Sequence, residues 1–166
     1  MAAFNFFGNK VARNERGGNM KILLIEGPLL DKIGEREPQI YGEKGTREKL
    51  MSAFYEKAQS LGIEVEAVSD YIEGNLAKII VNAKCDGIVI NPGAYTHTSV
   101  LLRDALLCSK IPFVEAHISN IFAREDFRHK SYLSDIALGV VTGLGSATYA
   151  AALAGLVTFL RAEIKL

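Results

Sequence analysis

Two stretches decide how the chain is organised. They read Gly87-Ile-Val-Ile-Asn-Pro-Gly-Ala-Tyr-Thr-His-Thr-Ser99 and Ile111-Pro-Phe-Val-Glu-Ala-His-Ile-Ser-Asn120, and in each a short apolar run ends in a polar cluster. Ligands of parallel α/β sheets bind outside the carboxyl ends of the strands, so we expect both clusters to meet at one edge. The polar residues concerned are Asn91, His97, Glu115, His117, Ser119 and Asn120. Two of the three histidines fall among them, which favours a binding or catalytic site.

The rest of the chain alternates apolar strands with amphipathic helices. We expect strands over residues 21–26, 63–68, 88–90, 112–115 and 136–142, and helices over 46–61, 72–83, 99–109 and 146–164, with a short helical turn over 121–128. Thr46 is expected to be the N-cap of the first helix and Gly62 to close it. The charged, glycine-containing stretch 29–45 is expected to be a loop, and loops this long usually bind or cover something. The order predicts a flavodoxin-like three-layer α/β sandwich around a five-stranded parallel sheet.

Composition limits the function classes. The 166 residues favour one domain, which we place at 20–166, after an N-terminal extension over 1–19 that is expected to be flexible. Nineteen basic and nineteen acidic residues leave no net charge and therefore no basic footprint for nucleic acid. No apolar run approaches the roughly 18–20 residues that span a membrane, and the apolar part of the extension is too short and broken for a signal peptide. We expect a cytoplasmic protein with no membrane partner, in which Cys85 and Cys108 are buried, reduced thiols.

Familiar cofactor motifs are absent from the sequence. Gly27-Pro28 follows the first strand but lacks the spacing of a dinucleotide fingerprint, and no P-loop lysine is present. The glycine-containing stretch 139–145 spans a strand end and a turn. Its glycines either allow the chain to turn before the last helix or contribute backbone amides to the floor of a site. We therefore expect no cofactor.

The histidines suit proton transfer better than metal binding. His97 and His117 lie 20 residues apart on different loops with Glu115 nearby, whereas a zinc site usually adds a third ligand at short spacing. A histidine after a strand end is suited to proton transfer or to hydrogen bonding a substrate hydroxyl. Arg124 and Arg128, four residues apart, either add a positive field or pair with acidic neighbours on a surface turn.

The long loop contains Arg36 and Tyr41 within Gly34-Glu-Arg-Glu-Pro-Gln-Ile-Tyr-Gly42. One interpretation is a solvated charged loop with a single packed tyrosine. The other is chemical: a neighbouring cation favours the phenolate form of a tyrosine, which can then act as a general base. The residues alone leave both interpretations open.

Taken together, these motifs resemble the type II 3-dehydroquinate dehydratases. The matching segments 34–42, 91–99, 115–120 and 124–128 come in the family's order and at its spacing, and the resemblance runs from about Met20 to about Leu160. It implies a hydro-lyase that dehydrates 3-dehydroquinate to 3-dehydroshikimate through an enolate, without metal, cofactor or Schiff base. It also implies a homo-oligomer, a dodecamer built of trimers.

The resemblance further implies roles for single residues. Tyr41 is the base that removes a proton next to the ketone, and Arg36 lowers the pKa of Tyr41 and supports the enolate. His117 is the acid that protonates the departing hydroxyl, and Glu115 orients it. The implied substrate-binding residues are Asn91, Gly93, His97, Ile118, Ser119 and Arg128, with Asp104 reaching toward a neighbouring subunit's site.

The chain departs from the family pattern after the first strand. The family usually has Gly-Pro-Asn there, and its asparagine helps to place a water at the enolate oxygen, whereas this chain has Leu29. Losing one such donor costs about 3–4 kcal/mol of transition-state stabilisation. Asp31 is expected to bring further negative charge near the anion. Three interpretations remain: a slow dehydratase of aromatic biosynthesis or quinate breakdown, a relative acting on another cyclic hydroxy-ketone acid, or a non-catalytic binding protein.

Overall fold

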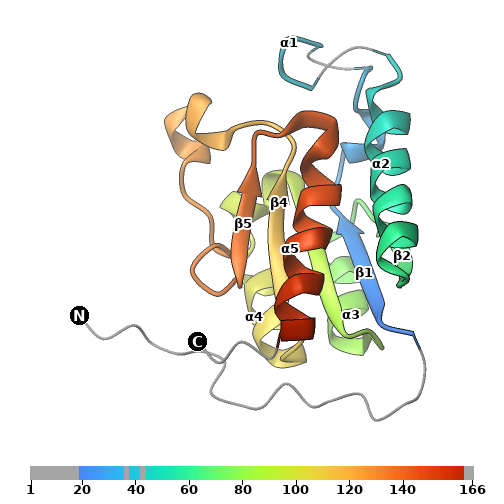
Figure 1. The fold of residues 1–166 in the computed structure, drawn as a ribbon. Coiled ribbons are helices and arrows are strands. Elements are labelled where there is room, and N and C mark those ends of the chain that lie inside the picture. Colours follow the sequence, from blue (N-terminus) through green and yellow to red (C-terminus); the bar gives the residue numbers. More distant parts are fainter. Residues whose placement is uncertain (1–18, 36–37, 42–43, 163–166) are drawn as a thin grey trace.

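A parallel sheet with a hydrophobic core on each face forms the centre of the fold (Figure 1). The computed structural model describes residues 19–35, 38–41 and 44–162, so most of the expected N-terminal extension lies outside the described residues. The strands are β1 (Lys21–Glu26), β2 (Glu64–Ser69), β3 (Gly87–Asn91), β4 (Phe113–His117) and β5 (Gly139–Thr142). They are parallel in the order β2-β1-β3-β4-β5, which is the flavodoxin-like order and confirms the predicted fold class.

Helices cover both faces of the sheet. One face carries α2 (Thr46–Leu61) and α5 (Thr148–Ala162), and the other carries α3 (Glu73–Asn82) and α4 (Val100–Ser109). In β1, Ile22 and Leu24 belong to the first core and Leu23 and Ile25 to the second, because successive side chains of a strand point to opposite faces. None of the described helices combines the length and the apolar character needed to cross a membrane.

Short helical segments cluster at the carboxyl ends of the strands. The helix α1 lies on that side of the sheet (Figure 1). It spans Pro38–Tyr41, and the 3₁₀ turns are Leu30–Lys32, Gly93–His97, Ile121–Ala123, Asp126–Arg128 and Gly145–Ala147. The stretch 29–45, which was expected to be a loop, therefore contains a 3₁₀ turn and a short helix. The single helical turn expected over 121–128 is instead two separate 3₁₀ turns.

The start of α2 differs from the prediction, whereas its end does not. Thr46 is the first helical residue and not the N-cap, because the chain enters the helix through Gly45, whose φ of 92° is readily adopted only by glycine. At the other end Gly62 caps the helix as expected, with a φ of 62° and backbone bonds to the carbonyls of Ala58 and Gln59.

Two other expectations were wrong in detail. The last strand begins at Gly139, because the amides of Ile136 and Ala137 bond back to the carbonyl of Leu133 and hold that part in a turn. Both cysteines are free thiols, but Cys108 is exposed on α4 and not buried.

Two turns at the carboxyl edge pack backbone against backbone. The amide of Gly27 donates to the carbonyl of Asn91 at 2.8 Å. A Cβ on Gly27 would lie 2.2 Å from the Pro92 carbonyl oxygen, and one on Gly93, where φ is 60°, would lie 3.2 Å from the Pro28 carbonyl oxygen. Glycine is therefore needed for this close approach, which fixes the loop after β1 against the loop after β3.

Candidate active site

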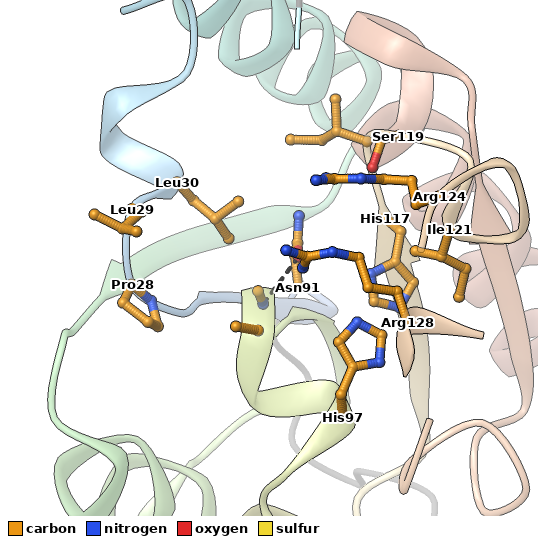
Figure 2. Close-up of a pocket in the computed structure, with 13 residues that line it drawn as sticks. Pro28, Leu29, Leu30, Asn91, His97, His117, Ser119, Ile121, Arg124 and Arg128 are labelled. Carbon is orange, nitrogen blue, oxygen red and sulfur yellow. Dashed lines mark hydrogen bonds between the residues drawn. The ribbon is translucent and has the colours of Figure 1, made fainter. Parts of the chain in front are cut away.

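The polar strand ends surround a cavity of about 180 Å³ at the carboxyl edge of the sheet (Figure 2). Pockets for drug-sized ligands hold roughly 300–1,000 Å³, so this one suits a small molecule. Figure 2 shows an apolar wall facing the arginine and histidine side chains across Asn91. The lining residues are Pro28, Leu29, Leu30, Asn91, Gly93, Ala94, His97, His117, Ile118, Ser119, Ile121, Arg124 and Arg128.

Most of the residues expected to bind substrate meet in this cavity. The structure brings together Asn91, Gly93, His97, His117, Ile118, Ser119 and Arg128. Asp104 does not join them, because it is exposed on α4. Asn120 also stays apart and caps the following 3₁₀ turn by accepting from the amide of Phe122.

The two residues expected to supply the base lie outside what can be described. Arg36 is outside the described residues, and so is the side chain of Tyr41, although α1 ends at that residue. Their predicted roles remain predictions. Within the described ranges, no group of three or more His, Cys, Asp or Glu residues is arranged to hold a metal ion.

His117 is held by Glu115 from the same face of β4, since residues two apart in a strand point the same way. The carboxylate of Glu115 is fully buried, and its Oε1 lies 2.8 Å from Nε2 of His117, which is 5% exposed. A carboxylate can only accept, so Nε2 is the donating nitrogen. This leaves Nδ1 of His117 for the cavity that the ring lines.

Three hydroxyls complete the environment of Glu115. Thr96 and Ser131 donate to Oε1, the latter at 2.8 Å, and Ser134 donates to Oε2. Burial acts to raise the pKa of Glu115, but the hydrogen bond and charge of His117 and the hydroxyls outweigh it, so the pKa is lowered. Glu115 therefore stands behind His117 as a fixed anion. Sequence reasoning missed these three donors, because isolated hydroxyls in loops carry no periodic signal.

His97 differs from His117 in which ring nitrogen carries the proton. Its Nδ1 lies 2.7 Å from the backbone carbonyl of Lys130, which can only accept, so Nδ1 carries the proton. Burial lowers the pKa of His97 and outweighs the opposing effect of the Lys130 bond, so the neutral ring is favoured. A neutral ring with Nδ1 protonated offers Nε2 to the cavity as an acceptor for a ligand hydroxyl.

Arg124 and Arg128 both line the cavity, and both also contact Glu125. Arg128 Nε donates to Glu125 at 2.9 Å, and Arg124 Nε lies 3.4 Å from the same carboxylate oxygen. Both interpretations left open by the sequence therefore apply. The arginines pair with an acidic neighbour and still bring positive charge to the cavity. Arg124 was not among the expected substrate-binding residues, although its position four residues before Arg128 is the signal that could have found it.

The sequence profile of the family described as Dehydroquinase class II matches residues 20–157. The chain belongs to this family. The matched range includes every element of the sheet and every residue that lines the cavity.

Individual family members match over nearly their whole length. The chain is 51% identical over 146 residues to a 3-dehydroquinate dehydratase of Prochlorococcus marinus, covering 87% of this chain and 97% of the relative. It is 48% identical over 144 residues to that of Shewanella sp. (strain MR-4), covering 87% and 99%. Among solved structures, the type II dehydroquinase from Butyrivibrio crossotus DSM 2876 superposes with a TM-score of 0.74 at 40% identity, covering 87% and 99%.

Leu29 occupies the position at which the sequence resemblance leads us to expect an asparagine. It lines the cavity with 43% of its surface exposed and has a φ of 66°, in the left-handed region that bulky residues rarely adopt. Asp31 is not among the residues that line the cavity. It accepts a hydrogen bond from the hydroxyl of Tyr71 at 2.6 Å, and the hydroxyl of Tyr95 in turn bonds the carbonyl of Tyr71 at 2.9 Å.

Proposed function

We propose that the chain is a 3-dehydroquinate dehydratase, a hydro-lyase of the shikimate pathway that converts 3-dehydroquinate to 3-dehydroshikimate and water. The observation that carries the proposal is His117, held by Glu115 at a small, positively charged cavity in a chain that matches the family along its length. The relatives that match over 97–99% of their own length are named 3-dehydroquinate dehydratases.

The first step breaks the C–H bond next to the ketone. Tyr41, as its phenolate, takes the proton, and the electron pair moves into the carbonyl to form an enolate. Arg36 favours the phenolate and stabilises the negative charge of the enolate. Supporting these roles is the position of α1, which ends at Tyr41 and lies on the side of the sheet where the strands end (Figure 1). The residues that line the cavity follow the same strand ends.

The second step breaks the C–O bond. The enolate electrons form the new C=C bond, while the departing oxygen takes a proton from Nδ1 of His117 and leaves as water. The anion of Glu115 keeps the other ring nitrogen protonated and stabilises the doubly protonated ring before transfer. A proton then passes from Tyr41 back to His117 to reset the pair.

The remaining cavity residues hold the substrate. His97 accepts from a ring hydroxyl through Nε2, and Asn91 offers amide groups to another. Arg128 supplies positive charge for an anionic ligand. Gly93, Ile118 and Ser119 line the cavity beside them and add to the substrate-binding set.

The test is an absorbance assay of the conjugated enone product formed from 3-dehydroquinate by the purified protein. We expect turnover by the wild type and a loss of at least about 10²-fold in kcat for Tyr41→Phe and His117→Asn, the usual contribution of one general acid or base. Tyr55→Phe, which removes the hydroxyl of an exposed tyrosine on α2, is the matched control and retains activity. A folded wild type without turnover, or a fully active Tyr41→Phe variant, contradicts the proposal.

We also propose that the chain forms a homo-oligomer, a dodecamer built of trimers, in the cytoplasm. Supporting assembly are Val100, Leu101 and Leu107, which are 54%, 47% and 41% exposed on α4. Asp104 lies on the same helix, where it can reach a neighbouring subunit's cavity. Light scattering on the purified protein measures the mass, and a monomer contradicts this proposal.

A second candidate substrate is favoured by Leu29. With Pro28 and Leu30 it forms an apolar wall of the cavity, which would suit a cyclic hydroxy-ketone acid that carries an apolar substituent. Comparing kcat/KM for 3-dehydroquinate with that for such an analogue decides between them. A higher value for the analogue supports the second candidate.

A further inference from the structure

An ion pair between a buried carboxylate and a partly exposed guanidinium lies beside the cavity and takes no part in the proposed chemistry. Glu26, the last residue of β1, is 1% exposed, and both of its carboxylate oxygens accept from the guanidinium of Arg47 in the first turn of α2. The ion pair links β1 to α2, the two elements that flank the chain segment containing Tyr41. A buried carboxylate is costly unless it is well partnered, and a third residue completes its partners. The hydroxyl of Tyr149, fully buried in the first turn of α5, donates to Glu26 Oε1 at 2.8 Å.

Tyr149 links this ion pair to the cavity through Asn91. Asn91 is the register partner of Glu26 in the β1–β3 ladder and is 2% exposed. Its Nδ2 donates to the hydroxyl oxygen of Tyr149 at 3.0 Å, and its Oδ1 accepts from the amide of Gly93 at 3.2 Å. The side chain of Asn91 therefore lies between a buried charge and the pocket that it lines.

The direction of these bonds follows from the charge. An ionised carboxylate only accepts, so the single hydroxyl proton of Tyr149 is committed to Glu26 and its oxygen is left as an acceptor. Burial and the charge of Glu26 raise the pKa of Tyr149 well above its ordinary value, so the proton stays on the hydroxyl. If the Asn91 amide were rotated by half a turn, Oδ1 would face the Tyr149 oxygen, and two acceptors would meet with no proton between them. Nδ2 would then face the amide of Gly93, and two donors would meet.

We propose that Tyr149, backed by Glu26 and Arg47, is a positioning residue that fixes the Asn91 amide in one orientation. A ligand then always meets the same N–H and the same lone pair of Asn91. This inference rests on the proposed function only for the identity of the ligand, 3-dehydroquinate.

A double-mutant cycle on the full-length protein tests the inference, with Tyr149→Phe, Asn91→Ala and the combined variant. Asn91 holds the substrate in both ground and transition states, so Tyr149→Phe raises KM about tenfold, equivalent to about 1.4 kcal/mol, and changes kcat less than about twofold. In the Asn91→Ala background the same change alters KM less than about twofold, because its only route of action is gone. Tyr55→Phe leaves both constants unchanged. An equal rise of KM in both backgrounds, or no rise in the wild-type background, overturns the inference.

Crystal structures of the unliganded wild type and variants give a readout that needs no turnover. Asn91 keeps one orientation in the wild type and rotates or splits into two in Tyr149→Phe. Glu26→Gln keeps the shape of the side chain, but the new amide can donate to the Tyr149 oxygen, so the Tyr149 hydroxyl proton is free to point toward Asn91. Asn91 is therefore expected to reorient in Glu26→Gln as well. This second variant is used if Tyr149→Phe does not fold. If 3-dehydroquinate is not turned over but Asn91 still reorients, the proposed function fails and the positioning stands. An Asn91 that keeps its orientation in either variant overturns the positioning, whatever the activity.

Discussion

Replacing Leu29 by asparagine is expected to leave stability nearly unchanged. The φ of 66° at Leu29 costs a residue with a Cβ roughly 1–2 kcal/mol. The side chain is 43% exposed, so its burial contributes about 1 kcal/mol of the roughly 1.5–3 kcal/mol of a fully buried leucine. Asparagine adopts the left-handed region more readily, so relief of strain offsets the lost burial. The free energy of unfolding of Leu29→Asn, measured by urea denaturation, should stay within about 1 kcal/mol of the wild type.

The same substitution is expected to raise turnover. Leu29 lines the cavity at the position where the sequence resemblance implies an asparagine, and one preorganised donor contributes about 10²–10³ in kcat. Leu29→Asn should therefore increase kcat for 3-dehydroquinate about 10²-fold in the absorbance assay.

Two matched variants separate strain from chemistry at this position. Leu29→Ala removes apolar surface but keeps a Cβ in the left-handed region, so we expect it to be about 1 kcal/mol less stable than the wild type. Leu29→Gly relieves the strain but loses about 0.5–1 kcal/mol to the greater freedom of the unfolded chain, and it should be more stable than the alanine variant. Neither adds a donor, so neither should gain turnover. Equal kcat in the asparagine and glycine variants refutes the missing-amide explanation, and equal stability of the alanine and glycine variants refutes the strain.

Three further predictions test other parts of the structure. The pKa of Glu115 is lowered in the folded state, so the stability it provides is present above the unfolded value of about 4.5 and is lost as the pH falls through the lower folded value; Glu115→Gln should flatten the pH dependence of unfolding below about pH 5, and a curve parallel to the wild type would contradict this. Thr148 Oγ1 is buried without a hydrogen-bond partner within the described part of the chain, so Thr148→Val should raise the unfolding free energy by about 1 kcal/mol, and a drop in denaturation midpoint would refute it. Gly27→Ala would place a Cβ 2.2 Å from the Pro92 carbonyl oxygen and should destabilise by about 3 kcal/mol, whereas Gly155→Ala, a helical position with open space, should stabilise by up to about 1 kcal/mol. Equal thermal midpoints for the two alanine variants would contradict the proposed close approach.

The succession of strands and helices and the location of the cavity followed from the sequence because both depend on local patterns. Short apolar runs that end in polar clusters predict buried parallel strands, and the carboxyl ends of such strands meet at one edge. The sequence therefore places Asn91, His97 and His117 at one edge, and the cavity contains all three. Exact starts were less predictable: β5 begins late because the chain around Ile136 bonds back to Leu133, a contact that competes with the strand pattern.

Local sequence patterns encode the alternation of strands and helices, and with it the edge at which the polar residues gather. How those residues are held depends instead on contacts between segments that are far apart in the chain. Glu26 and Tyr149 are 123 positions apart, and their hydrogen bond exists only because α5 packs on the face of the sheet to which Glu26 points. Likewise, only packing between the loops after β1 and β3 brings Gly27 so close to Pro92 that a Cβ would lie 2.2 Å from its carbonyl oxygen. Patterns of period two or 3.6 report which face a side chain occupies, but the partner it meets there is set by packing between distant segments.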